Sequence, residues 1–485
     1  MSKIQTNAFY SAILTVSNLI LPFITFPYVT RILAPAGIGQ VNFATSFIQY
    51  FVIIASLGVP LYGIREIAKA KDNIDLRSRI FFQLITIKLL CSLLALVIYL
   101  ILIFSLPKFT NYLPYYLWGL AIIFIGIFDF NYFFYALEDF KYITYRTIFF
   151  QIISVISIFI FIKTEQDALK YFYIPIFINF FNTLVNIKYI SRFLNFEAIK
   201  SKLQLRKHLK PLFLLFSIVF FTSIYNLLDS TILGFLAENV NVGYYSVASK
   251  IIRIPLALIM VLGPIMLPRI SMEFKNANFK EIKRMIAKSL QFVILMGVPI
   301  MVGIYALAPE IILLVSGKEF AASIDTLRIM SPIPLIIGLT TNYSTQLLVP
   351  MGKEKQLLYI VIFGTLCSLL LNFILIPILQ QNGSAISFLI TETVVLLACY
   401  FFTKKYITIS IPYKQIIVNI FISIPFAGIV LIAKHFLSLP ILIILISITV
   451  SALYYFIVQL YLIKNVLLLE IKVTVINKIK SITKL

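Results

Sequence analysis

Three charged side chains lie inside apolar stretches on either side of one short connection, and they are the first candidates for binding a ligand. Asp229 precedes the connection at residues 236–241, whereas Lys250 and Arg253 follow it. At ~1.5 Å per helical residue, all three would lie roughly 12–18 Å inside the hydrocarbon of a membrane. A charge at that depth costs about 2.5–3.5 kcal/mol and usually marks a substrate or ion pathway. The alternative is an ion pair that joins two helices, and that pair would still leave one cation for an anion.

Uncharged polar side chains follow one face of the neighbouring segments. Asn42, Ser46 and Gln49 recur at positions i, i+4 and i+7, which places them on one side of a helix. Asn226 precedes Asp229 by three residues and shares its helical face. We expect these side chains to line a cleft, and hydrogen bonding between packed helices is the alternative.

Four further charged residues fall within or at the ends of apolar runs: Arg31, Lys88, Asp129 and Glu392. Asp129, in the stretch FDFNYFFY, and Glu392 lie near the middle of their runs, where a protonatable carboxylate suits coupling to protons or sodium ions. An ordinary polar contact is the alternative for both. Lys88 is a candidate for the cleft or extends toward the cytoplasmic surface. Arg31 lies near the outer end of its run, as a cleft residue or an interfacial anchor.

Motifs that carry catalysis or cofactor binding do not occur in the sequence. It contains no P-loop, no GxSxG and no metal-ligand spacing, and its three cysteines, Cys91, Cys367 and Cys399, all lie inside apolar runs. We therefore predict neither an enzyme nor a cofactor or metal site. Outer loops are too short for the catalytic domain of a glycan polymerase, which favours transport.

The composition identifies the class of protein. The 485 residues are 61% hydrophobic and 12% charged, with a mean hydropathy of +1.00, and apolar runs of ~20 residues recur along the whole chain, each long enough to span a bilayer. We predict an all-α polytopic membrane protein with about fourteen transmembrane helices, at residues 8–30, 38–61, 80–105, 113–137, 146–163, 171–191, 211–236, 242–267, 286–308, 328–350, 357–378, 383–403, 413–434 and 439–462.

The net charge of +22 is distributed unevenly between the connections. Most lysines and arginines fall in alternate connections and in the two terminal regions, including Lys141 and Arg146 at the start of the fifth predicted span. Under the positive-inside rule these regions are cytoplasmic, so both termini are expected inside the cell. The same distribution argues against nucleic acid as a partner.

An internal repeat with sparse identities appears when the chain is shifted by 204 residues. Gly39 then falls on Gly243, Ala44 on Ala248 and Ile48 on Ile252. The repeat predicts two parallel six-helix lobes around a central cavity. The predicted organisation is an N-terminal lobe at 1–195, a basic cytoplasmic linker at 196–210, a C-terminal lobe at 211–404, and an appended helix pair with a basic cytoplasmic tail at 405–485.

Two stretches, PYVTRILAPAGIGQVNFATSFIQYFVIIASLGVPLYGIREIAKAKDN and DSTILGFLAENVNVGYYSVASKI, resemble the polysaccharide-biosynthesis flippases, the O-antigen (Wzx-type) translocases. That family belongs to a superfamily with multidrug/oligosaccharidyl-lipid exporters and lipid II flippases. The resemblance implies two six-helix lobes, alternating access, and a location in the bacterial inner membrane. It implies a substrate of undecaprenyl diphosphate carrying an oligosaccharide repeat unit, of O-antigen or capsule type, that moves to the outer leaflet.

Under this resemblance, Lys250 and Arg253 would hold the diphosphate and Asp229 would orient them. Lipid II flippases carry several arginines on the first helix, whereas this chain has only Arg31 there, which shifts the expected headgroup site to the cations at 250 and 253. The expected partners are the lipid-linked oligosaccharide, membrane lipids, H⁺ or Na⁺ and a glycan polymerase machinery. A drug/cation antiporter of the same fold is the alternative, and its cavity would be acidic or aromatic rather than cationic.

Overall fold

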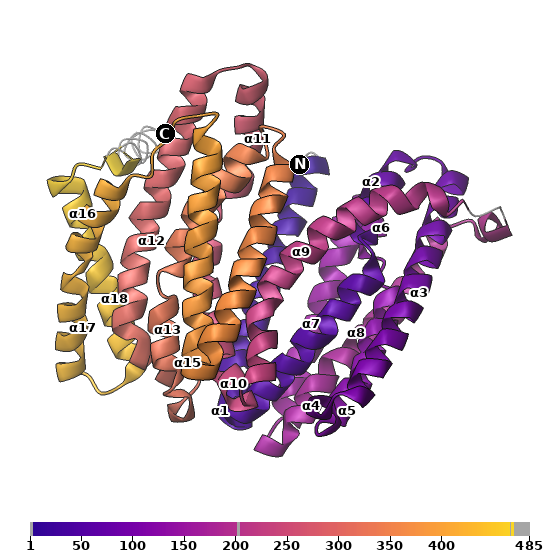
Figure 1. Ribbon diagram of the computed structural model, residues 1–485, viewed down its shortest axis with the longest axis horizontal. Helices are drawn as coiled ribbons and strands as arrows, with labels where there is room; N and C mark the ends of the chain where they lie inside the picture. The colour runs from indigo at the N-terminus through magenta and orange to yellow at the C-terminus, as the bar shows by residue number, and fades with distance from the viewer. Residues whose placement is uncertain (1–2, 201–203, 466, 470–485) are drawn as a thin grey trace, which may run out of the picture. The chain divides into compact units, whose positions relative to one another are not determined.

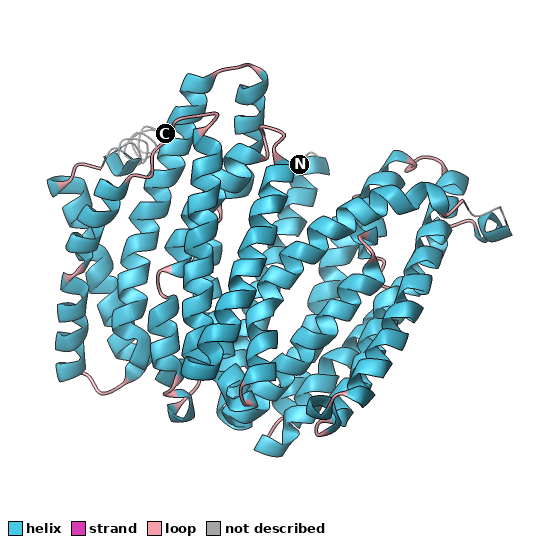
Figure 2. Ribbon diagram, in the orientation of Figure 1, coloured by secondary structure: helices cyan, strands magenta, loops and turns pink. Residues whose placement is uncertain are grey.

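The computed structural model describes residues 3–200, 204–465 and 467–469, which fold into helices joined by short connections (Figures 1 and 2). No β-strand occurs within these ranges, so the prediction of an all-α protein is confirmed. Residues 201–203 of the predicted linker and the predicted basic tail from residue 470 lie outside the described residues. The chain divides into two compact units, Met1–Gly243 and Tyr244–Leu485.

The first unit consists of helices because continuous apolar segments in lipid must satisfy their backbone hydrogen bonds internally. Asn73 and Asp139 cap two of these helices by accepting from backbone N–H groups in the first turn. The helices are α1 (Lys3–Ser56), α2 (Val59–Lys69), α3 (Ile74–Ser105), α4 (Pro107–Thr110), α5 (Leu113–Ile127), α6 (Asn131–Ala136), α7 (Phe140–Phe161), α8 (Ala168–Ile190), α9 (Arg206–Leu236) and the start of α10 (Asn239–Ile259), with 3₁₀ turns at Glu165–Asp167, Ser191–Phe193 and Phe196–Lys200.

The second unit contains the rest of α10 and eight further α-helices within the described ranges. They are α11 (Leu262–Lys275), α12 (Phe279–Val315), α13 (Ser323–Met330), α14 (Ile333–Tyr343), α15 (Glu354–Lys404), α16 (Tyr413–Ser423), α17 (Pro425–Phe436) and α18 (Pro440–Ile457), with a 3₁₀ turn at Lys318–Phe320 and π-helical turns at Ser344–Leu348 and Val458–Leu462.

Two helices are too long to cross a membrane once. The 54 residues of α1 would extend about 80 Å at ~1.5 Å per residue, against about 30 Å of hydrocarbon. Its backbone leaves the helical region at Ala34, where φ is 54° and Pro35 follows, and α15 does so at Gln380, where φ is 50°. Each helix therefore covers two of the predicted spans.

Eleven helices of the described ranges are long and apolar enough to cross a membrane. The difference from fourteen has a local cause. The segments Phe9–Lys69 and Glu354–Lys404 each hold two predicted spans, and the predicted span at 328–350 is divided into α13, α14 and a π-helical turn. Every predicted span thus has a helical counterpart.

Helix α1 is central to the first unit, where it packs against α3, α5, α7 and α9. The imidazole of His208, on α9, lies between Tyr62 of α2 and Gln83 of α3, at 2.8 and 2.7 Å. These bonds connect the start of α9 to α2 and α3. The predicted lobe boundaries at 195 and 211 stay a prediction.

The second unit is organised around α12, which packs against α13, α14, α16, α17 and α18. The C-terminal helix pair is attached to it by an ion pair of 2.8 Å between Lys434 and Glu310. Within the pair, the hydroxyl of Tyr455 and the amide of Gln459 both donate to Asn419 Oδ1. Figure 1 shows these helices in yellow beside α12.

Candidate functional site

Asp229 occupies a buried position on α9, with 5% of its surface exposed. Tyr50, on the second half of α1, lies close to Thr231 and interacts electrostatically with Asp229. Because α1 packs against α9, the carboxylate lies in a polar contact between these two helices of the first unit.

Lys250 and Arg253 lie three residues apart on α10, on one face of the helix, in the second unit. Lys250 is half-buried, Arg253 is exposed, and their charges interact. Two cations at this spacing repel each other, and a bound anion would relieve that repulsion. The pairing of Asp229 with either cation stays a prediction.

The uncharged candidates bond mainly within their own helices. The Asn42 amide donates to the carbonyl of Ile38 at 2.8 Å, and the Asn226 amide donates to that of Thr222 at 2.7 Å. Ser46 is half-buried and Gln49 is exposed on α1. The sequence predicted that these amides line a cleft or bond between packed helices, and it did not predict bonding to the preceding turn of the same helix. The role of these side chains in a cleft stays a prediction.

The first unit contains a helix break at Asp129, between α5 and α6. The Asp129 side chain is exposed, and its Oδ1 accepts from the backbone N–H of Asn131 at 3.1 Å. The break frees a backbone carbonyl, and Lys88 Nζ of α3 donates to that carbonyl oxygen at 3.1 Å. A discontinuous helix of this kind is where membrane transporters commonly form ion or substrate sites.

Lys88 does not extend to the membrane surface, so that expectation is corrected. Its side chain is buried, with 3% exposed, and its ammonium also lies over the ring of Tyr132, 6.0 Å from the centroid. The freed carbonyl of Asp129 supplies a partner within the helix bundle, which removes the reason for the lysine to reach water.

Arg146 is a buried cation that reasoning from the sequence placed with the cytoplasmic charges. It lies on α7, 6% exposed, and donates to Oδ1 of Asn131 on α6 at 2.6 Å and to Oδ1 of Asn186 on α8. Its guanidinium lies over the ring of Tyr142, 5.3 Å from the centroid. Arg146 thus connects three helices through neutral partners, and no carboxylate among the described residues lies within ion-pair distance of it. Because Arg146 follows a basic connection, nothing in the sequence indicated that it is buried.

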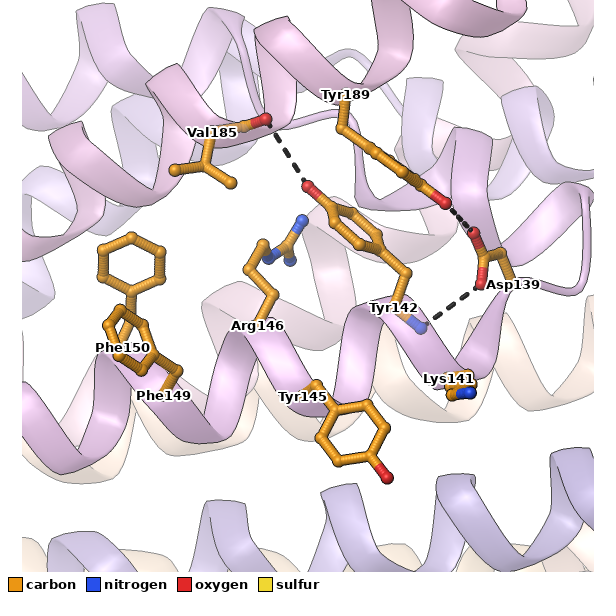
Figure 3. A pocket seen from close by; sticks show the side chains of 9 residues that line it. All are labelled: Asp139, Lys141, Tyr142, Tyr145, Arg146, Phe149, Phe150, Val185 and Tyr189. Carbon is orange, nitrogen blue, oxygen red and sulfur yellow. Dashed lines mark hydrogen bonds between the residues drawn. The ribbon is translucent and has the colours of Figure 1, made fainter.

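A pocket of about 480 Å³ opens beside Arg146 (Figure 3). The rings of Tyr142 and Tyr189 stack with their centroids 3.7 Å apart, and the Tyr189 hydroxyl donates to Asp139 at 2.8 Å. Aromatic and apolar walls with charged groups at one end suit an amphiphilic molecule. The lining residues are Asp139, Lys141, Tyr142, Tyr145, Arg146, Phe149, Phe150, Val185 and Tyr189.

The two remaining candidates are Arg31, in the first unit, and Glu392, in the second. Arg31 is exposed on α1, three residues before the bend at Ala34, and Glu392 is buried in α15 with 5% exposed. No group of three or more His, Cys, Asp or Glu side chains in the described ranges has metal-binding geometry. The roles of Arg31, Glu392 and Asp129 in binding or coupling stay predictions.

A family comparison identifies the chain. The model of the family described as "Polysaccharide biosynthesis protein" matches residues 4–274, which is more than half of the sequence. The chain belongs to the polysaccharide biosynthesis protein family. A second family model, MatE, matches residues 215–374. The resemblance read from the two sequence stretches is therefore confirmed.

Curated relatives carry transporter names. A protein of Escherichia coli (strain K12) named "Putative O-antigen transporter" is 26% identical over 400 residues, covering 81% of this chain and 95% of its own. A protein of Shigella dysenteriae with the same name is 25% identical, covering 79% and 95%. The lipid II flippase MurJ of Bacillus subtilis (strain 168) is 25% identical over 141 residues, covering 28% and 26%.

Solved structures share the fold. A lipid II flippase MurJ in an inward closed conformation aligns with a TM-score of 0.71 at 17% identity, covering 94% of this chain and 100% of that one. A multidrug resistance MATE family transporter in an inward-facing conformation aligns with a TM-score of 0.65 at 13% identity, covering 80% and 94%. This chain therefore has the helical transporter fold of these proteins.

Proposed function

We propose that this protein is a flippase that moves undecaprenyl-diphosphate-linked oligosaccharide repeat units, of O-antigen or capsule type, from the inner to the outer leaflet of the bacterial cytoplasmic membrane. The observation that carries the proposal is the pair of cations, Lys250 and Arg253, on one face of a membrane helix. The names of two relatives, O-antigen transporters, and of a third, a lipid II flippase, support the same substrate class.

The chemistry of the pair matches a diphosphate. A diphosphate carries at least two negative charges, and Lys250 with Arg253 supplies two positive charges at a spacing that one headgroup can bridge. In a medium of low dielectric constant such charge-assisted hydrogen bonds are stronger than in water. Asp229 would orient the cations or balance their charge when substrate is absent.

The transport cycle that we propose is alternating access between two lobes with a central cavity. Asn42, Ser46, Gln49 and Asn226 would line the path of the polar glycan, with Arg31 near its outer end. Lys88 contributes to the polar interior of the first lobe. No step requires a covalent change in the substrate, so the proposal is transport without catalysis.

Other partners follow from the charges within the membrane. Asp129 and Glu392 are the candidates for coupling to H⁺ or Na⁺, because a carboxylate at depth can exchange its proton or bind a cation. The flipped repeat unit would pass to a glycan polymerase machinery at the outer surface. Surrounding membrane lipids would contact the exposed apolar faces of the helices. The cytoplasmic location of both termini stays a prediction.

A transport assay tests the proposal. Purified protein in vesicles would receive a radiolabelled undecaprenyl-diphosphate oligosaccharide, and transfer between leaflets would be measured for wild type and for Lys250→Gln/Arg253→Gln. We expect the double variant to lose at least tenfold in transport rate. The matched control, Lys280→Gln/Arg284→Gln, removes the same charges from exposed positions on α12 and should retain activity. Equal rates in all three proteins would reject the assignment of the diphosphate to α10.

Antiport of drugs and cations is the second candidate because the MatE model matches residues 215–374. The same two cations argue against it, since they would repel a cationic substrate. Vesicles loaded with an organic cation distinguish the two functions. Export of the cation by wild type, together with no movement of the lipid-linked glycan, would replace the flippase proposal with antiport.

A further inference from the structure

A second pocket lies within the first unit, at the end where α1 bends. It has a volume of about 480 Å³ and lies between the bend of α1, the connection that contains α4, and the start of α10. Figure 1 labels α1, α4 and α5 at this end of the unit. Its polar lining comes from Gln40, Lys108, Asn111, Glu238 and Asn239. In the predicted orientation this end faces the outside of the cell.

The backbone around the pocket is packed very closely. A Cβ atom added to Gly39 would lie 1.6 Å from the carbonyl oxygen of Asn239, and one added to Gly243 would lie 2.1 Å from that of Pro35. Only glycine permits such an approach of two backbones. The bend of α1 and the start of α10 therefore form a rigid wall, and a rigid wall loses little entropy when a ligand binds.

Gln40 provides the strongest indication of a ligand. Its side chain is 4% exposed, and its amide oxygen accepts a hydrogen bond from the Asn239 amide. The Gln40 Nε2 donor and the Asn239 Oδ1 acceptor are both buried and have no hydrogen-bond partner in the described part of the chain. One unpaired donor and one unpaired acceptor, on two amides that bond each other, suit a hydroxyl group, which accepts and donates at the same atom.

Charged and aromatic residues also line the pocket. Lys108 Nζ donates to the carbonyl of Ala237 at 3.1 Å, and Glu238 is exposed at the rim. Burial lowers the pKa of Lys108, and the nearby Glu238 carboxylate opposes that change. Tyr112 and Tyr115 add aromatic rings to the lining. A ring face with planar amides and a carboxylate around it can contact both the apolar faces and the hydroxyls of a sugar.

We propose that this pocket is a carbohydrate-binding subsite that holds part of the glycan after it reaches the outer side of the membrane. The inference rests on the proposed flippase function and extends it to a second site, separate from the cations that would hold the diphosphate. The volume lies within the range of small-ligand pockets and far exceeds that of one water molecule. The subsite recognises hydroxyls, so it binds the glycan without its lipid.

A binding measurement with lipid-free glycan tests the subsite. The full-length protein in lipid nanodiscs would be titrated by calorimetry with the oligosaccharide released by mild acid from the undecaprenyl-linked repeat unit of the producing strain. We expect saturable binding by wild type, weakened about three- to tenfold by Gln40→Met, which removes the buried donor. Asn111→Ala, an exposed substitution with little effect on folding, should weaken binding similarly.

Control variants and a local reporter make the result specific. Gln166→Ala removes an exposed amide from the connection between α7 and α8, at the same end of the unit but outside the pocket, and should bind like wild type. Trp118, the single tryptophan of the chain, lies one helical turn after Tyr115 and should change its fluorescence on binding.

The outcomes separate this inference from the proposed function. No binding by wild type at millimolar glycan, or equal binding by wild type and all three variants, would overturn the subsite. If the lipid-linked glycan is still transported in the vesicle assay, the flippase proposal survives that result. If wild type transports no lipid-linked glycan, the flippase proposal itself fails, whatever the lipid-free glycan does.

Discussion

Arg146 shows how far the environment of one residue departs from what its neighbours in sequence indicate. It follows Lys141 in a predicted cytoplasmic connection, so the sequence predicts that its charge lies on the cytoplasmic side. In the structure it is buried and donates to Asn131 and Asn186 from two other helices. A buried guanidinium that bonds neutral amides keeps its full charge and depends on those bonds for its stability.

Replacement of Arg146 by lysine should therefore destabilise the first unit. Arg146→Lys retains a charge but cannot reach both asparagines with a planar fork, and we expect a loss of about 1–3 kcal/mol. Thermal unfolding in detergent would measure it as a lower Tm. Lys141→Gln, an exposed change on the same helix, is the control. Equal Tm values for both variants would show that the bonds of Arg146 contribute nothing.

Asp129 leads to a functional prediction at the same scale. If its carboxylate exchanges the coupling ion, Asp129→Asn should abolish the dependence of transport on a pH or sodium gradient while residual transport continues. Rates in vesicles with and without each gradient would show this. Asp72→Asn, at an exposed site beside α3, should leave the dependence unchanged. A gradient response retained in Asp129→Asn would leave Glu392 as the candidate.

At the scale of elements, the sequence predicted where the helices lie but not where they break or bend. The apolar runs predicted the spans well, and the run from 113 to 137 was predicted as one span although it contains Asp129. The sequence did not predict that this run divides into α5 and α6 at Asp129, since a break depends on partners such as Lys88 that come from elsewhere in the chain. The amides of the candidates Asn42 on α1 and Asn226 on α9 bond within their own helices, which the pattern of polar residues did not predict.

The close packing beside the bend of α1 predicts that a substitution of Gly39 destabilises the protein. Gly39→Ala would place a Cβ against the backbone of Asn239, and we expect a destabilisation of about 1–3 kcal/mol from overpacking. Gly303→Ala on α12 is the matched control, because no atom lies within 4 Å of its added Cβ. That control should be neutral or slightly stabilising, because alanine has the higher helix propensity. Thermal unfolding compares the two, and similar Tm values would contradict the close contact.

At the scale of the whole molecule, composition and the repeat of apolar runs were sufficient for the class, and two short stretches were sufficient for the family. The same information could not position Arg146 or reveal the pocket around Gln40, because both depend on residues far apart in sequence. The orientation of the chain across the membrane is predicted from the positive charges in its connections, and this prediction needs no contact between distant residues.

Labelling of single cysteines tests that orientation. After replacement of the three natural cysteines, Gln166→Cys should react with a membrane-impermeant maleimide in intact cells, because it is exposed in a predicted outer connection. Asn276→Cys, exposed in a predicted cytoplasmic connection, should react only after the membrane is opened. The reverse pattern would invert the topology and place the proposed subsite inside the cell.

The contact between Gly39 and Gly243 also bears on ancestry. These two residues correspond under the shift of 204, and a Cβ on Gly39 would lie 2.8 Å from the backbone nitrogen of Gly243. In a homodimer of identical half-length chains, a contact between equivalent residues lies on the two-fold axis. If the repeat arose by duplication, the contact between Gly39 and Gly243 marks where two copies of a smaller ancestor met before one gene encoded both.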